Sequence, residues 1–187
     1  DNRDGYNDFN TFYLQAASGT KGGSSGSPVV DYQGRAVAMN AGGNNDESAT
    51  AYFLPLEQVV RALKFIQMSK DSSGCGWEAV YIPRGTLQVT FLYKGFNEAR
   101  KLGLRSETEQ MVRDASPAGE TGMLVVDSLV PGGPAHEKLE PGDILVRVNG
   151  EVITRFLNLE TLLNNSVGQE IALFIQRGDI SMTVNLL

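Results

Sequence analysis

Cysteine and histidine are almost missing from this sequence, and their scarcity removes several kinds of chemistry. Cys75 is the only cysteine and His136 the only histidine among 187 residues. One cysteine cannot form a disulfide within the chain, and one cysteine with one histidine cannot supply a zinc cage of Cys and His ligands. We therefore expect no metal site and no cofactor. The cysteine usage alone leaves the redox compartment open.

The chain also lacks an excess of positive charge and a long apolar run. Lys and Arg number 16 against 22 Asp and Glu, and the isoelectric point is near 4.8. A phosphate backbone attracts concentrated positive charge, so nucleic acid is not an expected partner. No stretch approaches the roughly 18 apolar residues that suggest a membrane span. The start, DNRDGYNDFN, has no leader pattern and no initial methionine, so we expect no membrane partner and an excerpt of a longer protein.

What is present divides into two parts. In the first part we expect a strand at 11–17, a hairpin turning at 32–34, and a helix near Pro55 with apolar residues at helical spacing. The composition then becomes polar and rich in Gly and Ser. These shifts predict a first domain at 1–68, a linker at 69–83 and a second domain at 84–187.

The second part alternates short apolar runs with turn residues, as in a mainly β domain. We expect strands at 85–95, 122–130 and 144–153, helices at 96–104 and 156–165, a loop at 105–121, and a hairpin turning at Gly178 and Asp179. Short strands with two helices predict a partly open β-barrel of about a hundred residues.

The most informative stretch is TKGGSSGSPVVD at residues 20–31, where small residues surround Ser25. A nucleophilic serine in a two-barrel protease stands on a tight turn beside backbone N–H groups that stabilise the oxyanion. Gly23 and Ser25 would supply those N–H groups. Gly26 would leave room behind the nucleophile, and Pro28 would start the outgoing strand. The alternative interpretation is a flexible Gly/Ser linker. A phosphate-binding loop is not indicated, because it needs Gly-Lys followed by Ser or Thr, whereas Lys21 here precedes the two glycines.

The surroundings of this loop resemble the HtrA/Do-like serine proteases. In that family the nucleophile loop, usually Gly-Asn-Ser-Gly-Gly-Pro, is followed by a strand ending in Asn, as at 37–40, and by a GFAIP-like strand, as at 52–55. Ser24 and Ser27 replace the usual Asn and second Gly. With these two serines the loop resembles the large eukaryotic Do-like proteases, which have degenerate protease and PDZ repeats, more than the usual family pattern. The resemblance implies that 1–68 is the C-terminal part of a chymotrypsin-like β-barrel.

The resemblance also implies roles for single residues and for the whole protein. Ser25 would be the nucleophile, Gly23 would provide an oxyanion-hole N–H, and Asn40, Ala41 and Gly42 would pair with the backbone of unfolded or extended polypeptide substrates. Family members are ATP-independent endopeptidases of protein quality control. The resemblance further favours an intracellular compartment, nucleus or cytoplasm, and a homo-oligomer in the complete protein.

The second part is similar to the PDZ domain that follows the protease domain in HtrA proteins. The similarity rests on LVPGGPAHEKLEPGDILVRVNGEVI at 129–153, where PGD leads into an ILxVNG strand. A PDZ groove adds a C-terminal or internal peptide as a strand, and successive N–H groups hold a terminal carboxylate. The matching cradle would be Gly85, Thr86, Leu87, Gln88 and Val89, with Gln88 where the family often has Gly. Leu87 and Val89 also fit simple core positions of a strand.

No complete triad can be read from these residues. In the family the catalytic His and Asp precede the Ser, so both are expected before Asp1. His136 lies far from Ser25 in the sequence, in an expected PAHEKL helix, and Asp31 and Asp46 fit turn and loop positions. Two functions therefore stand: a fragment of an active Do-like serine endopeptidase, or a non-catalytic peptide-binding PDZ module or pseudoprotease fragment. Without a base, Ser25 is a weak nucleophile, so we expect this chain alone to be inactive.

Overall fold

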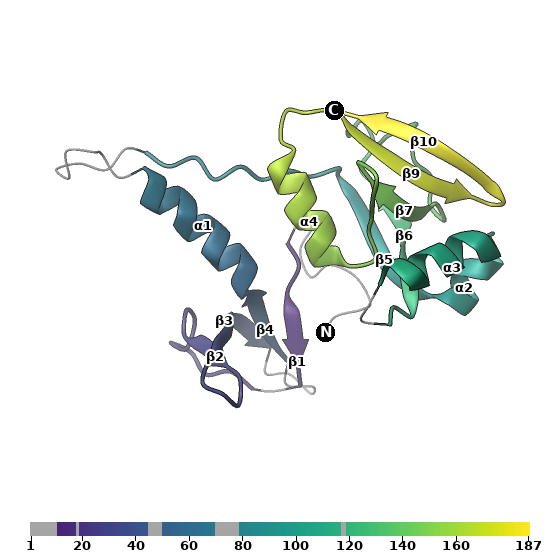
Figure 1. The fold of residues 1–187 in the computed structure, drawn as a ribbon. Helices are drawn as coiled ribbons and strands as arrows, with labels where there is room; N and C mark the ends of the chain where they lie inside the picture. The colour runs from purple at the N-terminus through teal and green to yellow at the C-terminus, as the bar shows by residue number, and fades with distance from the viewer. Residues whose placement is uncertain (1–10, 18, 45–49, 70–78, 117–118) are drawn as a thin grey trace. The chain divides into compact units, whose positions relative to one another are not determined.

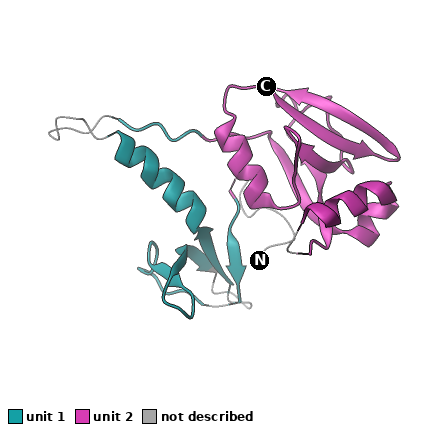
Figure 2. Ribbon diagram, viewed as in Figure 1, with its two compact units in different colours: residues 1–2, 12–83 teal, residues 3–11, 84–187 magenta. Residues whose placement is uncertain are grey.

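The structure is a computed structural model that describes residues 11–17, 19–44, 50–69, 79–116 and 119–187. It is mainly β with short helices (Figure 1). The described chain forms two compact units, one of residues 12–83 and one of residues 84–187 together with Thr11 (Figure 2). Each unit is described below by itself.

The first unit is built on a four-stranded antiparallel sheet with strand order β1-β4-β3-β2. Asp31 shapes the turn of the β2–β3 hairpin, because its Oδ1 accepts the N–H groups of Gln33 and Arg35. The hairpin predicted around residues 32–34 and the turn role of Asp31 are thus confirmed. The strands are β1 Leu14–Ala16, β2 Pro28–Val30, β3 Ala36–Asn44 and β4 Thr50–Pro55.

The predicted helix after this sheet is α1, Leu56–Met68, and Pro55 stands at its N-cap. Proline is suited to a helix start because it has no N–H to leave unpaired. No residue of α1 is buried, and Val60, Leu63 and Ile66 are 40–47% exposed. The apolar stripe that the sequence predicts is therefore present, but the described residues leave it largely uncovered.

The second unit contains a larger antiparallel sheet with strand order β10-β9-β7-β6-β5, and β8 pairs with β7. Of its central strands, β7 is buried except at the half-buried Arg147, and β6 is buried from Gly122 to Val126 but exposed at Asp127 and Ser128. The hairpin predicted at the C-terminal end is β9–β10. The strands are β5 Val89–Gly95, β6 Gly122–Leu129, β7 Ile144–Val148, β8 Glu151–Val152, β9 Ile171–Arg177 and β10 Ile180–Leu186.

Three helices accompany this sheet, not two: α2 Phe96–Lys101, α3 Ser106–Ala115 and α4 Phe156–Asn165. The prediction of a loop at 105–121 was wrong because α3 has few apolar residues. It is held instead by Val112, which is fully buried, and by Glu109, whose carboxylate accepts hydrogen bonds from Arg100 and Arg113 at 2.7–2.9 Å. No helix among the described residues is long and apolar enough to cross a membrane.

Two further expectations need correction. The strand predicted at 144–153 is two strands, because Asn149 and Gly150 both have positive φ, 49° and 86°, and reverse the chain between β7 and β8. An Asn-Gly pair favours this turn because both residues tolerate the left-handed region. The helix expected around His136 is instead a run of turns. Part of the predicted linker, 70–78, lies outside the described residues.

Candidate functional site

Two consecutive turns carry Ser25. The Ser24 N–H donates to the Lys21 carbonyl, and the Ser27 N–H donates to the Ser24 carbonyl, each at 3.1 Å. The third residue of each turn is a glycine with positive φ, Gly23 at 90° and Gly26 at 84°. A type II turn needs positive φ at this position, and only glycine adopts it without strain. The glycine spacing therefore explains the backbone of the loop and leaves the Ser25 side chain exposed.

The three serines of the loop differ in their hydrogen bonds. Ser24 Oγ donates to the Lys21 carbonyl and Ser27 Oγ to the Ser24 carbonyl, both at 2.6 Å. Within the described residues, the Ser25 hydroxyl has no such partner, and the N–H groups of Gly23 and Ser25 donate no hydrogen bond. The loop thus offers one free hydroxyl beside two free N–H groups.

Asn40 of β3 holds this loop by both its backbone and its side chain. Its N–H donates to the Ser27 carbonyl at 2.9 Å, and its carbonyl accepts the Gly26 N–H at 2.7 Å. Its Nδ2 donates to the Ser24 carbonyl at 3.0 Å and to Ser24 Oγ at 2.9 Å. Asn40 is 6% exposed, so these bonds are shielded from water. The sequence analysis, which used only the backbone of Asn40, did not find these side-chain bonds to the loop.

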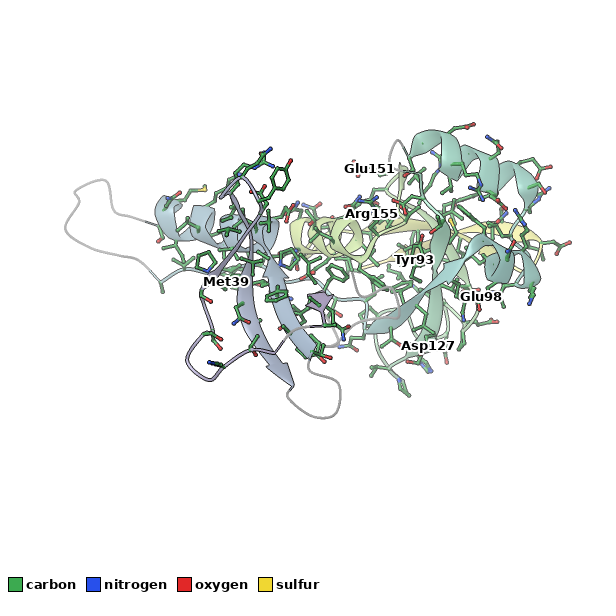
Figure 3. The ribbon with its side chains drawn as sticks, turned by 90° about the horizontal axis from the view of Figure 1, so that it is seen from below. Met39, Tyr93, Glu98, Asp127, Glu151 and Arg155 are labelled. Atoms are coloured by element: carbon green, nitrogen blue, oxygen red, sulfur yellow. The ribbon has the colours of Figure 1, made fainter. Side chains whose placement is uncertain are left out.

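The predicted substrate strand, Asn40 to Gly42, begins where β2 stops pairing with β3. The last β2–β3 pair is Pro28 with Met39, and Met39 is labelled in Figure 3. The pairing of β3 with β4 shifts between Asn40 and Gly42, which makes Ala41 an extra residue in the strand. Of the three predicted residues, Asn40 is already bonded to the loop through its backbone, whereas Ala41 and Gly42 lie in the part of β3 that extends past β2.

No catalytic base accompanies Ser25 among the described residues. His136 is exposed in the second unit. Asp31 binds Arg35 through Oδ2 at 2.8 Å, and the Arg35 N–H is the main cause that lowers the pKa of Asp31. Asp46 lies outside the described residues. The part of the chain that the structure describes also contains no cluster of His, Cys, Asp or Glu suited to a metal.

The second candidate site is the segment before β5. Of the predicted cradle, Gly85 to Gln88 are not in a strand, and only Val89 belongs to β5. Strand β5, where Tyr93 is labelled in Figure 3, pairs with β6 and with no other described strand. Its second edge is therefore available for an added strand.

The side chains of the cradle have mixed roles. Leu87 and Val89 are 6% and 4% exposed, so the alternative reading of them as core residues agrees with their burial. Gln88 has a φ of 54°, a conformation that costs a non-glycine residue energy. Its carbonyl accepts the Val130 N–H at 3.0 Å, and its N–H donates to Thr86 Oγ1 at 3.1 Å.

Helix α4 fixes the entry to this segment. Asn164 Oδ1 accepts the Gly85 N–H at 2.9 Å, and Glu160 Oε1 lies 3.3 Å from Arg84 Nη2. A Cβ on Gly85 would lie 2.2 Å from the carbonyl oxygen of Leu163, so only glycine fits there. Glu160 and Asn164, 3% and 1% exposed, were missed by the sequence reading. Their i, i+4 spacing, which places them on one face of the helix, was the available signal.

A pocket of about 230 Å³ opens between the same segment and the end of α4. Apolar side chains form much of its wall, while Arg84 stands among the lining residues. A pocket of this kind beside a free strand edge can receive one side chain of a bound peptide. The apolar residues that line it are Leu87, Leu163, Val167, Ile171 and Leu187.

Comparisons with known sequences agree with this architecture. A family model described as PDZ domain matches residues 125–177. The chain is 68% identical over 184 residues to Protease Do-like 7 of Arabidopsis thaliana. The aligned residues make up 98% of this chain and 17% of that protein. It is 47% identical over 182 residues to the pro-apoptotic serine protease NMA111 of Ajellomyces capsulatus, covering 97% of this chain and 17% of that protein. The chain thus spans about a sixth of these relatives.

Solved structures give the same fold. The HtrA-type protease AlgW with a decapeptide aligns with a TM-score of 0.52 and 20% identity, over 93% of this chain and 48% of that chain. Its S227A form with a decapeptide aligns with a TM-score of 0.51 and 18% identity, over 93% and 47%. The sequence relatives and the shared fold lead to one assignment. The chain belongs to the HtrA/Do-like serine protease family and is a segment that joins the end of a trypsin-like protease barrel to a PDZ domain.

Proposed function

We propose that the complete protein is an ATP-independent serine endopeptidase that acts in protein quality control, with Ser25 as its nucleophile. The supporting observation is the loop itself: Ser25 alone among its three serines keeps a free hydroxyl, beside the unengaged N–H groups of Gly23 and Ser25. In this role the hydroxyl attacks the peptide carbonyl, and the two N–H groups stabilise the oxyanion that forms. A His and an Asp elsewhere in the protein would supply the base and its orienting group.

The substrates in this proposal are unfolded or extended polypeptides. Ala41 and Gly42 extend past the end of β2, where the backbone of an extended substrate can pair with them. Asn40 has a positioning role, because its hydrogen bonds hold the loop on both sides of Ser25. The PDZ unit binds further peptide segments along β5, and the protein acts as a homo-oligomer.

A fluorophosphonate probe tests the nucleophile. In the complete protein it should label Ser25, and Ser25→Ala should abolish both labelling and peptidase activity. Ser27→Ala is the matched control, because Ser27 lies in the same loop with its hydroxyl bonded to Ser24. Labelling that survives Ser25→Ala but not Ser27→Ala would show that the nucleophile is misassigned.

The alternative function is a peptide-binding module in which only the PDZ unit acts. One observation favours it: strand β5 has a free edge, whereas Ser25 has no base among the described residues. The sequence of the rest of the protein separates the two functions. A His and an Asp at protease spacing support the endopeptidase, and their absence supports the module.

A further inference from the structure

Capture of a terminal carboxylate by the segment before β5 would need free donors. A carboxylate is held by several converging N–H groups or by a cation, and such charge-assisted hydrogen bonds are stronger than neutral ones. The N–H groups of the cradle and the guanidinium of Arg84 are the donors at this place. Besides the Gly85 N–H, which donates to Asn164 Oδ1 at 2.9 Å, two of these groups already have partners within the second unit.

The first committed donor is the Gln88 N–H. It donates to Thr86 Oγ1 at 3.1 Å, so the cradle closes on its own threonine. On the far side of the residue, the Gln88 carbonyl accepts the Val130 N–H at 3.0 Å. These two bonds hold the residue at its φ of 54°. A carboxylate would have to displace the threonine hydroxyl before it could use this N–H.

The second committed donor is Arg84. Its Nη2 lies 3.3 Å from Oε1 of Glu160. Because Glu160 is 3% exposed, its charge needs a nearby cation, and Arg84 provides it. The positive and negative charges cancel at the entrance of the cradle. Arg84 is therefore a poor attractor for a second carboxylate.

No described strand, in contrast, pairs with the outer main-chain edge of β5. The peptide bond between Gln88 and Val89 is trans, and its carbonyl points toward β6, where it accepts the Val130 N–H. In a trans peptide the N–H points the opposite way, so the Val89 N–H faces the free edge. The strand continues from Val89 to Gly95, with the apolar pocket beside its start.

We propose that this groove binds internal extended segments of unfolded polypeptides and gains little from a chain terminus. The backbone of the segment pairs with the free edge of β5, and one apolar side chain enters the pocket of about 230 Å³. This inference rests on the proposed peptide-binding function of the PDZ unit. It adds which part of a polypeptide the unit recognises.

The test compares one apolar peptide in three forms on the 187-residue chain, by fluorescence anisotropy. The forms are the free acid, the C-terminal amide, and the same sequence flanked on both sides by Gly-Ser residues. All three should bind within about threefold of one another. A site that reads the carboxylate through charge-assisted bonds would bind the acid at least about tenfold more tightly, and this result would overturn the inference while leaving peptide binding intact. If none of the three binds, the proposed peptide-binding function fails as well.

Two variants test the cause. Thr86→Ala releases the Gln88 N–H, and Glu160→Gln releases Arg84 from its ion pair. Each should raise the preference for the acid over the amide by about fivefold or more, because a donor becomes available to a charged acceptor. Thr183→Ala, on the exposed face of β10, is the matched control and should leave the ratio unchanged. If both Thr86→Ala and Glu160→Gln still bind the peptides but leave the acid-to-amide affinity ratio unchanged, the contacts of Thr86 with the Gln88 N–H and of Glu160 with Arg84 do not determine that ratio.

Discussion

The two units differ in how much apolar surface each buries by itself. Among the described residues of the first unit, the buried apolar side chains are few and include two alanines, whereas the second unit buries most residues of its central strands β6 and β7. Those of the first unit are Phe12, Ala38 and Ala51. A loop can be shaped by turns and hydrogen bonds alone, as around Ser25. A cooperative core needs covered apolar faces, and in the part of the chain that the structure describes only the second unit has them.

The largest expected effect separates the two units by stability. Leu173→Ala in β9 removes a side chain with no exposure, and it should cost about 2–5 kcal/mol of unfolding free energy. Leu63→Ala in α1 removes a side chain that is 47% exposed, and it should change the unfolding free energy by less than about 0.5 kcal/mol. Urea unfolding followed by circular dichroism measures both. Similar costs at the two positions would remove the contrast between the units.

The next effect concerns the oxyanion loop. Gly23→Val places a β-branched residue at a φ of 90° and should lower kcat of the complete protein by about a hundredfold or more, the usual scale for one lost donor. Gly22→Val is the control, because Gly22 is not in the positive-φ region and a Cβ there meets open space. Unchanged turnover in Gly23→Val would remove Gly23 from the site.

A smaller effect should follow from the anchor of this loop. Asn40→Leu keeps the size of the side chain but removes the bonds from Nδ2 to Ser24. Because lost positioning acts on the reacting geometry, kcat should fall by about tenfold with little change in KM. Steady-state kinetics with the complete protein gives both values. A rise in KM with kcat unchanged would instead assign Asn40 to substrate binding.

The last effect depends on pH and involves Glu109 in the second unit. Its hydrogen bond from Arg100, with the added contact of Arg113, holds the pKa of Glu109 below the usual value. Stability from this carboxylate is thus present above the ordinary Glu pKa and is lost as pH falls through the folded-state pKa. Glu109→Gln should cost about 1–3 kcal/mol near neutral pH and progressively less in acid. Glu107→Gln, at an exposed position, should cost almost nothing, and urea unfolding at several pH values compares the two.

Sequence reasoning found the features that local chemistry determines. The glycines of the Ser25 loop, the β2–β3 hairpin and helices α1 and α4 follow from turn residues and apolar spacing. Helix α3 was missed because Val112 and Glu109 are buried by contacts from elsewhere in the unit. The side-chain role of Asn40 and the pairing of Arg84 with Glu160 join residues that are 16 and 76 positions apart. No local pattern in a single sequence reports such pairs.

The central claim is that the second unit holds its own core, whereas the sheet that carries Ser25 does not. Hydrogen exchange on the 187-residue chain tests this claim most directly. The account predicts slow exchange at the amides of β6, β7 and β9, which share the buried core, and fast exchange at the amides of β2, β3 and β4. Equal protection of the two sets of strands would contradict the account.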